Sequence, residues 1–233
     1  YKGEELKTLY FGGGTPSVLT VEEFSEIIEL FNLTEGCEVT TELNPETMNL
    51  EYLSGLRHAG VNRVSFGCQT FDDGILKNIG RRHSADCVKQ AVKFAKDAGF
   101  ENISLDFIYG LPKQSLEGFE RDLNTALGLS VQHMSLYGLK IDEGCYFYEH
   151  APKNLPDEDM QADMYLKAIE VLTTAGFEHY EISNFAQNGY QSRHNLNYWD
   201  NNSYYGFGVA AHGYEDGVRY FNTTSIDEYL KNP

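Results

Sequence analysis

The chain has 233 residues, and its 35 acidic and 18 basic side chains give a formal net charge of −17. This balance argues against a broad nucleic-acid-binding face and against docking on an anionic membrane, because both need clustered Lys and Arg. Hydrophobic residues make up 41% of the chain and aromatic residues 13%, which is enough for a sizeable core. We expect neither a transmembrane segment, which needs roughly 18 apolar residues in a row, nor a signal peptide.

The cysteines are scattered along the sequence, at Cys37, Cys68, Cys87 and Cys145. No CxxC or CxxxC spacing occurs, so we expect neither a disulfide framework nor a metal site built from these thiols. Reduced thiols of this kind indicate a cytoplasmic protein.

Short apolar segments that end in Gly, Pro or polar residues recur along the chain and predict strands. The candidates are residues 6–11, 38–43, 63–67, 103–109, 133–139 and 178–182. Amphipathic helices are expected between them, with N-caps at Thr20, Asn49, Ser84 and Ser115 and a longer helix over about 157–175. Strands that alternate with helices imply parallel pairing through right-handed crossovers. The pattern therefore predicts an α/β barrel, a partial barrel or an open doubly wound sheet.

The alternation of strands and helices stops near Asn184. Residues 184–205 are dense in Asn, Tyr, Gln and His and show weak periodicity. We therefore expect an irregular segment that crosses the end of the sheet.

Polar residues that follow the predicted strands are candidates for one site, because parallel α/β folds bind ligands beyond the carboxyl ends of their strands. Residues 12–14, three glycines, could offer backbone N–H groups to a ligand or form a plain tight turn; they match neither a phosphate loop nor a dinucleotide fingerprint. Glu42 could bind an ammonium or hydroxyl group, or be a cap or surface carboxylate. Gln69 could bind a ribose diol, or be a turn amide.

Two further candidates carry charge. Asp106 lies among apolar residues, where burying a carboxylate is costly unless it is paired, and this favours a functional role. Arg81, followed by a second arginine, could pair with a carboxylate or be solvated.

An aromatic group occupies residues 194–199, which contain His194, Tyr198 and the only tryptophan, Trp199. Such a group can ligate or stack on a flat cofactor. The alternative is that its aromatic side chains simply hold the segment in place.

Several motifs, in order, make the sequence resemble radical S-adenosylmethionine (SAM) proteins, and more narrowly the oxygen-independent coproporphyrinogen III oxidases and their relatives. They are YFGGGTPS at 10–17, ELNP at 42–45, SFGCQTF at 65–71, GRRH at 80–83 and DFIYGLP at 106–112. The resemblance covers essentially the whole chain. Within the family, YEISNFA at 180–186 and HNxxYW at 194–199 are similar to the HemW branch of heme chaperones.

The resemblance implies a partial (β/α)6 radical SAM barrel without its first strand over residues 1–183. Residues 184–233 would form a crossover segment and the start of a C-terminal domain. It also implies roles for single residues. The expected contacts to SAM are Gly13, Gly14 and Thr15 on its amino-acid part, Glu42 nearby, Gln69 and Asp106 on the ribose, and Arg81 on the carboxylate; the expected heme contacts are His194, Tyr198 and Trp199.

The implied cofactors are SAM, heme and a [4Fe–4S] cluster, and the implied partners are heme or porphyrin, heme-acceptor proteins and an electron donor. The family holds its cluster with a CxxxCxxC loop, which this sequence lacks. We therefore expect an internal fragment that has no cluster ligands and no radical activity of its own. Two alternatives stay open: a coproporphyrinogen III oxidase, and a barrel enzyme that uses residues 12–14 to bind a small acidic or phosphorylated substrate.

Overall fold

The computed structural model describes residues 2–231, which group into two compact units. The larger unit contains Leu9–Leu30 and Glu38–Gln191, and the smaller unit contains the other described residues. The expected boundary between residues 183 and 184 stays a prediction.

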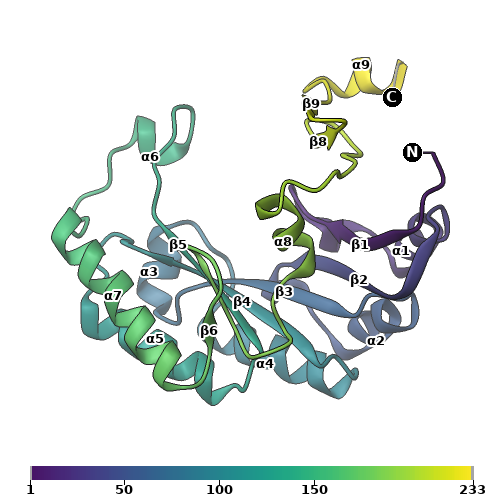
Figure 1. Ribbon diagram of the computed structural model, residues 1–233. Coiled ribbons are helices and arrows are strands. Elements are labelled where there is room, and N and C mark those ends of the chain that lie inside the picture. The colour runs from purple at the N-terminus through teal and green to yellow at the C-terminus, as the bar shows by residue number, and fades with distance from the viewer. Residues whose placement is uncertain (1, 232–233) are drawn as a thin grey trace. The chain divides into compact units, whose positions relative to one another are not determined.

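A seven-stranded sheet organises the fold. Its order is β1 (Leu6–Phe11), β2 (Leu33–Leu43), β3 (Arg63–Gln69), β4 (Asn102–Tyr109), β5 (His133–Gly138), β7 (Asn184–Ala186) and β6 (Glu178–His179). The pairs β2–β3, β3–β4 and β4–β5 are parallel, as predicted. The sheet curls as part of a barrel (Figure 1), so the fold is the expected partial α/β barrel.

Helices connect successive strands of this sheet. They are α1 (Val21–Glu29), α2 (Leu50–His58), α3 (Asp73–Asn78), α4 (Ala85–Asp97), α5 (Leu116–Gly128) and α7 (Glu158–Thr174), with short turns η1 (Pro16–Val18), η2 (Pro45–Thr47) and α6 (Tyr146–Glu149). The predicted capping box is present. The Thr20 side chain accepts a hydrogen bond from the Glu23 N–H, and the Glu23 side chain accepts one from the Thr20 N–H. Asn49, Ser84 and Ser115 also cap their helices as predicted.

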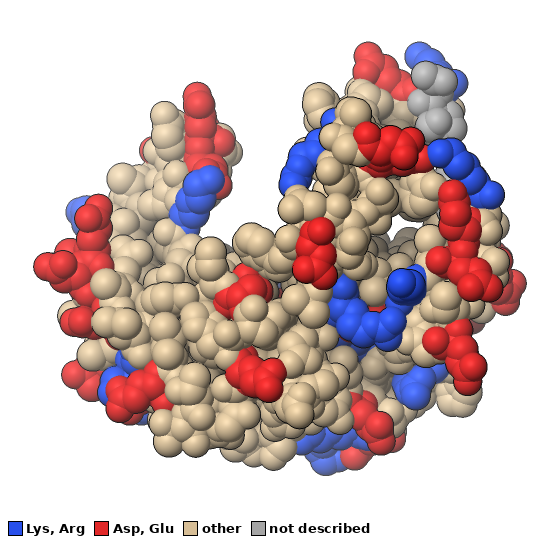
Figure 2. All heavy atoms as spheres, in the orientation of Figure 1, with Lys and Arg blue, Asp and Glu red and all other residues tan. Residues whose placement is uncertain are grey.

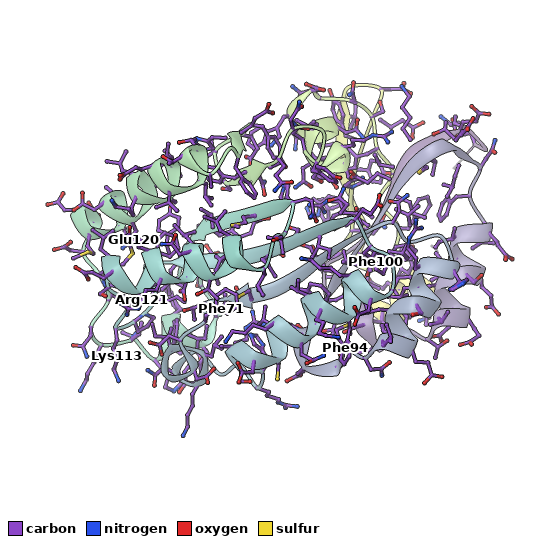
Figure 3. The ribbon with its side chains drawn as sticks, turned by 90° about the horizontal axis from the view of Figure 1, so that it is seen from below. Phe71, Phe94, Phe100, Lys113, Glu120 and Arg121 are labelled. Atoms are coloured by element: carbon purple, nitrogen blue, oxygen red, sulfur yellow. The ribbon has the colours of Figure 1, made fainter. Side chains whose placement is uncertain are left out.

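The two faces of the sheet differ in chemistry because side chains alternate along a strand. One face is apolar and packs on the helices: Phe66, Leu105 and Phe107 are fully buried. Helices α4 and α5 run side by side across this face (Figure 3). The opposite face is polar. It carries Thr40 and Glu42 of β2, Arg63 and Ser65 of β3, Ser104 and Asp106 of β4, and His133 and Ser135 of β5, in register.

The sixth predicted strand differs from expectation. β6 has only two residues, and β7 lies between β5 and β6, antiparallel to both. The chain reverses direction after His179, and Ser183 then accepts the Leu136 N–H at 2.7 Å, so the later segment takes the place beside β5.

The segment expected to be irregular is partly helical. Helix α8 (Arg193–Trp199) begins after Ser192, whose side chain accepts the Asn195 N–H. Its polar and aromatic residues give little hydrophobic periodicity, which is why the sequence pattern does not predict it. The smaller unit also contains the hairpin β8 (His212–Glu215) and β9 (Val218–Phe221), and helix α9 (Ile226–Lys231).

The surface agrees with the acidic composition. On the face drawn in Figure 2, acidic side chains are spread across the surface and basic ones form small groups between them. Among the described helices, none combines the length and apolar character needed to cross a membrane.

Candidate active site on the polar face of the sheet

The glycine-rich loop follows β1 directly. Residues 12–15 are exposed and lie between β1 and the turn η1. Gly13 has a φ of +93°, which favours glycine, and a Cβ added at Gly13 or Gly14 would meet no atom within 4 Å. The loop therefore leaves open space in which a ligand can approach the backbone. Thr15 ends the loop, just before Pro16 begins η1.

Glu42, at the carboxyl end of β2, is bound to this loop. Its Oε1 accepts a hydrogen bond from the Tyr10 hydroxyl at 2.7 Å, and its carboxylate also accepts the Gly13 N–H. A Cβ at Gly12 would lie 2.6 Å from the Tyr10 ring and 3.0 Å from Glu42 Oε1, so this position has no room for a side chain. Burial raises the pKa of Glu42, and the charge of Asp106 acts in the same direction. Glu42 therefore joins the glycine-rich loop to the polar face of the sheet.

Asp106 lies on β4, with part of its surface open. The Ser65 hydroxyl on β3 is 2.9 Å from each of its carboxylate oxygens, so it can donate to either. Burial raises the pKa of Asp106, while hydrogen bonds from Ser135 and Ser65 and the charge of Arg63 oppose the rise. These hydroxyls offset part of the cost of burying the carboxylate, and its expected functional role stays a prediction.

Gln69 reaches the same place from the end of β3. Its backbone is left-handed, with a φ of +66°, and the register between β3 and β4 shifts between Gly67 and Gln69. A Cβ at Gly67 would lie 3.0 Å from Gln69 Nε2, so the side-chain amide folds back over Gly67. Because Gly67 is the register partner of Asp106, the amide and the carboxylate face one region.

Arg81 is not linked to these residues. It is exposed in the loop between α3 and α4, and among the described residues no hydrogen bond or ion pair involves its guanidinium. Its expected pairing with a carboxylate stays a prediction.

The aromatic group 194–199 lies on α8, in the smaller unit. His194 Nδ1 is 2.8 Å from the Thr8 hydroxyl, and Nε2 is 2.7 Å from the Tyr198 hydroxyl. Tyr198 is 42% exposed and Trp199 56% exposed. Ligation by either ring nitrogen of His194 would therefore require a hydrogen bond to open, while Trp199 presents a large apolar surface.

Sequence reasoning missed several residues of the polar face. Tyr10 and Ser65 hold the two carboxylates, and Arg63 is a buried cation, 2% exposed, whose Nε has no hydrogen-bond partner in the described structure. For Arg63 and Ser65 the signal was their alternation with Val64 and Phe66 along a predicted strand, which indicates that one sheet face is polar.

The described residues do not fit an iron–sulfur cluster. None of the four cysteines forms a disulfide, Cys37 and Cys68 are buried, and within residues 2–231 no group of three His, Cys, Asp or Glu side chains could hold a metal ion. A cluster would need ligands from outside these residues.

Comparison with known proteins shows which family the chain belongs to. The model of the Radical SAM superfamily matches residues 1–126. The heme chaperone HemW of Bacillus subtilis (strain 168) is 41% identical over 97% of this chain and 62% of that protein. The heme chaperone HemW of Lactococcus lactis (strain IL1403) is 41% identical over 98% of this chain and 62% of that protein. The heme chaperone HemW of Escherichia coli (strain K12) is 39% identical over 91% of this chain and 57% of that protein. The chain thus spans less than two thirds of the length of these relatives.

Among solved structures, coproporphyrinogen III oxidase (HemN) from Escherichia coli, a radical SAM enzyme, has the same fold. It superposes with a TM-score of 0.85 at 23% identity, over 97% of this chain and 56% of that chain. The archaeal Elp3 of Methanocaldococcus infernus superposes with a TM-score of 0.60 at 17% identity, over 69% and 44% of the two chains. The family match covers more than half of the 233 residues and includes the glycine-rich loop, Glu42, Gln69 and Asp106. The chain belongs to the radical SAM superfamily.

Proposed function

We propose that the protein containing this chain is a HemW-type heme chaperone, which binds heme and transfers it to acceptor proteins. The observation that carries the proposal is the 41% identity to curated heme chaperones over nearly the whole chain. An electron donor and heme-acceptor proteins are its proposed partners. The free cysteines support a reducing compartment, the cytoplasm.

SAM is the cofactor that the polar face fits. The Gly13 and Gly14 backbone and Thr15 would meet its amino-acid part, with Glu42 near the ammonium group. Gln69 and Asp106 would hold the ribose hydroxyls, because an amide and a carboxylate facing one region can bind a diol. Arg81 would pair with the carboxylate. When bound, SAM supplies a sulfonium centre that can accept an electron; the residues of this chain orient it and limit water.

Gly67→Ala tests the ribose contact without removing either polar group. The new Cβ would lie 3.0 Å from Gln69 Nε2 and displace the amide, so we expect SAM affinity to fall about tenfold, through the loss of one hydrogen bond between the amide and the ribose. Gly128→Ala, at the exposed end of α5 and outside the site, is the matched control for added volume, since its Cβ meets nothing. Calorimetric titration of both full-length variants measures the effect, and equal affinities would contradict the placement of Gln69.

For heme, we propose contacts with His194, Tyr198 and Trp199, because α8 combines an imidazole with exposed aromatic surface. Heme titration of the full-length protein should give a saturable change in the absorbance band. His194→Ala or Trp199→Ala should lower the affinity for heme, measured by this titration, at least tenfold. His58→Ala, an exposed histidine on α2, is the control and should leave the titration unchanged.

The same titration separates the chaperone from an oxidase. An unchanged heme spectrum, together with consumption of coproporphyrinogen III under anaerobic reducing conditions, would overturn the chaperone proposal. It would favour the oxidase alternative instead.

A further inference from the structure

The turn after β3 is held in a conformation that its own residues do not favour. Gln69 has a φ of +66°, in the left-handed region that side chains other than glycine rarely adopt. The turn is tight, because the Thr70 N–H donates to the Cys68 carbonyl at 2.8 Å. Such a backbone persists only where neighbouring groups fix it.

Asp122, on α5, is the group that fixes this turn. Its Oδ2 accepts a hydrogen bond from the Thr70 hydroxyl at 2.6 Å, and its Oδ1 accepts the Phe71 N–H at 2.9 Å. The Thr70 hydroxyl in turn accepts the Asp72 N–H at 3.1 Å. Figure 3 shows Phe71 beside helix α5. Both carboxylate oxygens are thus used on the two residues that follow Gln69.

The position of Asp122 is costly for a carboxylate. The side chain is 5% exposed on the buried face of α5, beside Phe119 and Leu123, both fully buried. Within the described residues Asp122 forms no salt bridge, although the charges of Asp72 and Arg121 act on it. A buried charge without an ion pair is retained where its hydrogen bonds serve another group.

The turn sets the direction of the Gln69 side chain. The left-handed backbone and the register shift bring the amide back over Gly67, opposite Asp106. We propose that Asp122 is a positioning residue that acts through Gln69: it locks the Thr70–Phe71 turn and thereby orients the Gln69 amide toward the ligand. The inference rests on the proposed function in taking SAM as that ligand.

The protonation of Asp122 supports this role. Burial raises the pKa of Asp122 to about 6, and the charge of Asp72 acts in the same direction, while the two hydrogen bonds and Arg121 oppose it. Cys68, on β3, also faces Asp122, and burial raises the pKa of its thiol well above the usual value, so it stays neutral. Protonation of Asp122 removes an acceptor from the turn, so ligand affinity should fall as the pH drops below about 6.

The experiment is a double-mutant cycle on SAM affinity in the full-length protein. At pH 7.5, Asp122→Asn should weaken SAM binding about tenfold on its own and less than twofold in a Gln69→Ala background, because the effect passes through Gln69. Thr70→Val, which removes the hydroxyl from the other side of the contact, should reproduce the loss if Asp122→Asn folds poorly. As the pH falls from 7.5 to below 6, the wild type should lose more affinity than Asp122→Asn, because Glu42 and Asp106 titrate in both proteins and Asp122 only in the wild type. Gln132→Ala is the control, since Gln132 anchors a loop at the opposite end of β4 by accepting the Ile103 N–H.

A readout without ligand separates this inference from the proposed function. The side-chain amide resonance of Gln69, assigned by its loss in Gln69→Ala, should shift in Asp122→Asn and Thr70→Val and stay fixed in Gln132→Ala. Failure of the wild type to bind SAM would overturn the SAM site. An unmoved Gln69 resonance, or equal losses of affinity with and without Gln69, would overturn the role of Asp122.

Discussion

Replacing Asp106 with alanine is expected to weaken SAM binding by the full-length protein about 100-fold. The carboxylate is held by hydroxyls on the two neighbouring strands, so it is already oriented for a diol. A hydrogen bond to a charged group contributes about 1.5–3 kcal/mol, and the upper part of that range corresponds to about 100-fold in affinity. Isothermal titration at pH 7.5 measures the dissociation constant.

Two variants define what the Asp106 result means. Ser65→Ala leaves the carboxylate but removes the hydroxyl that orients it, so we expect a loss of only about threefold to tenfold. Asp97→Ala, at the exposed end of α4, removes a carboxylate of equal charge and should change nothing. Wild-type affinity in Asp106→Ala would show that the carboxylate does not hold the ribose. Binding of a small acidic or phosphorylated substrate near residues 12–14 would then become the stronger reading.

Most of the sheet follows from local sequence patterns. Residues 6–11 form β1 as predicted, and Thr20, Asn49 and Ser84 cap their helices, because these features depend on a few neighbouring residues. The exchange of β6 and β7 does not follow, since both segments are too short to show a periodic pattern. Which one pairs with β5 is decided by hydrogen bonds across the sheet.

The candidate site was predictable only in part. Strand ends indicate the glycine-rich loop, Glu42 and Gln69, because parallel strands bring their carboxyl ends to one edge. The left-handed turn at Gln69 gives no sequence signal, since glutamine is rare in that conformation. The role of Asp122 gives no sequence signal either. It lies in an amphipathic helix, 52 residues away along the chain from the hydroxyl it binds.

The second large effect expected is a pH dependence of stability that arises from Asp122. Its pKa is raised from 3.8 to about 6 in the folded chain, so between these values the folded state binds more protons than the unfolded state. Stability contributed by the neutral carboxyl group is therefore complete below pH 4 and is lost as the pH rises through about 6. A difference of roughly two pKa units corresponds to about 3 kcal/mol.

Urea unfolding of the wild type and Asp122→Asn between pH 4 and 7.5 measures this loss. The wild type should lose about 3 kcal/mol relative to the variant across that range, because asparagine does not titrate. Glu42 and Asp106, whose pKa values are also raised, are present in both proteins and cancel in the difference. A difference that stays constant with pH would mean that Asp122 is ionised as easily in the folded chain as in the unfolded one. The expected result instead makes the ionised Asp122 less favourable for folding at neutral pH than the protonated acid is at pH 4. We therefore attribute the acid at this position to its hydrogen bonds with the turn that follows Gln69.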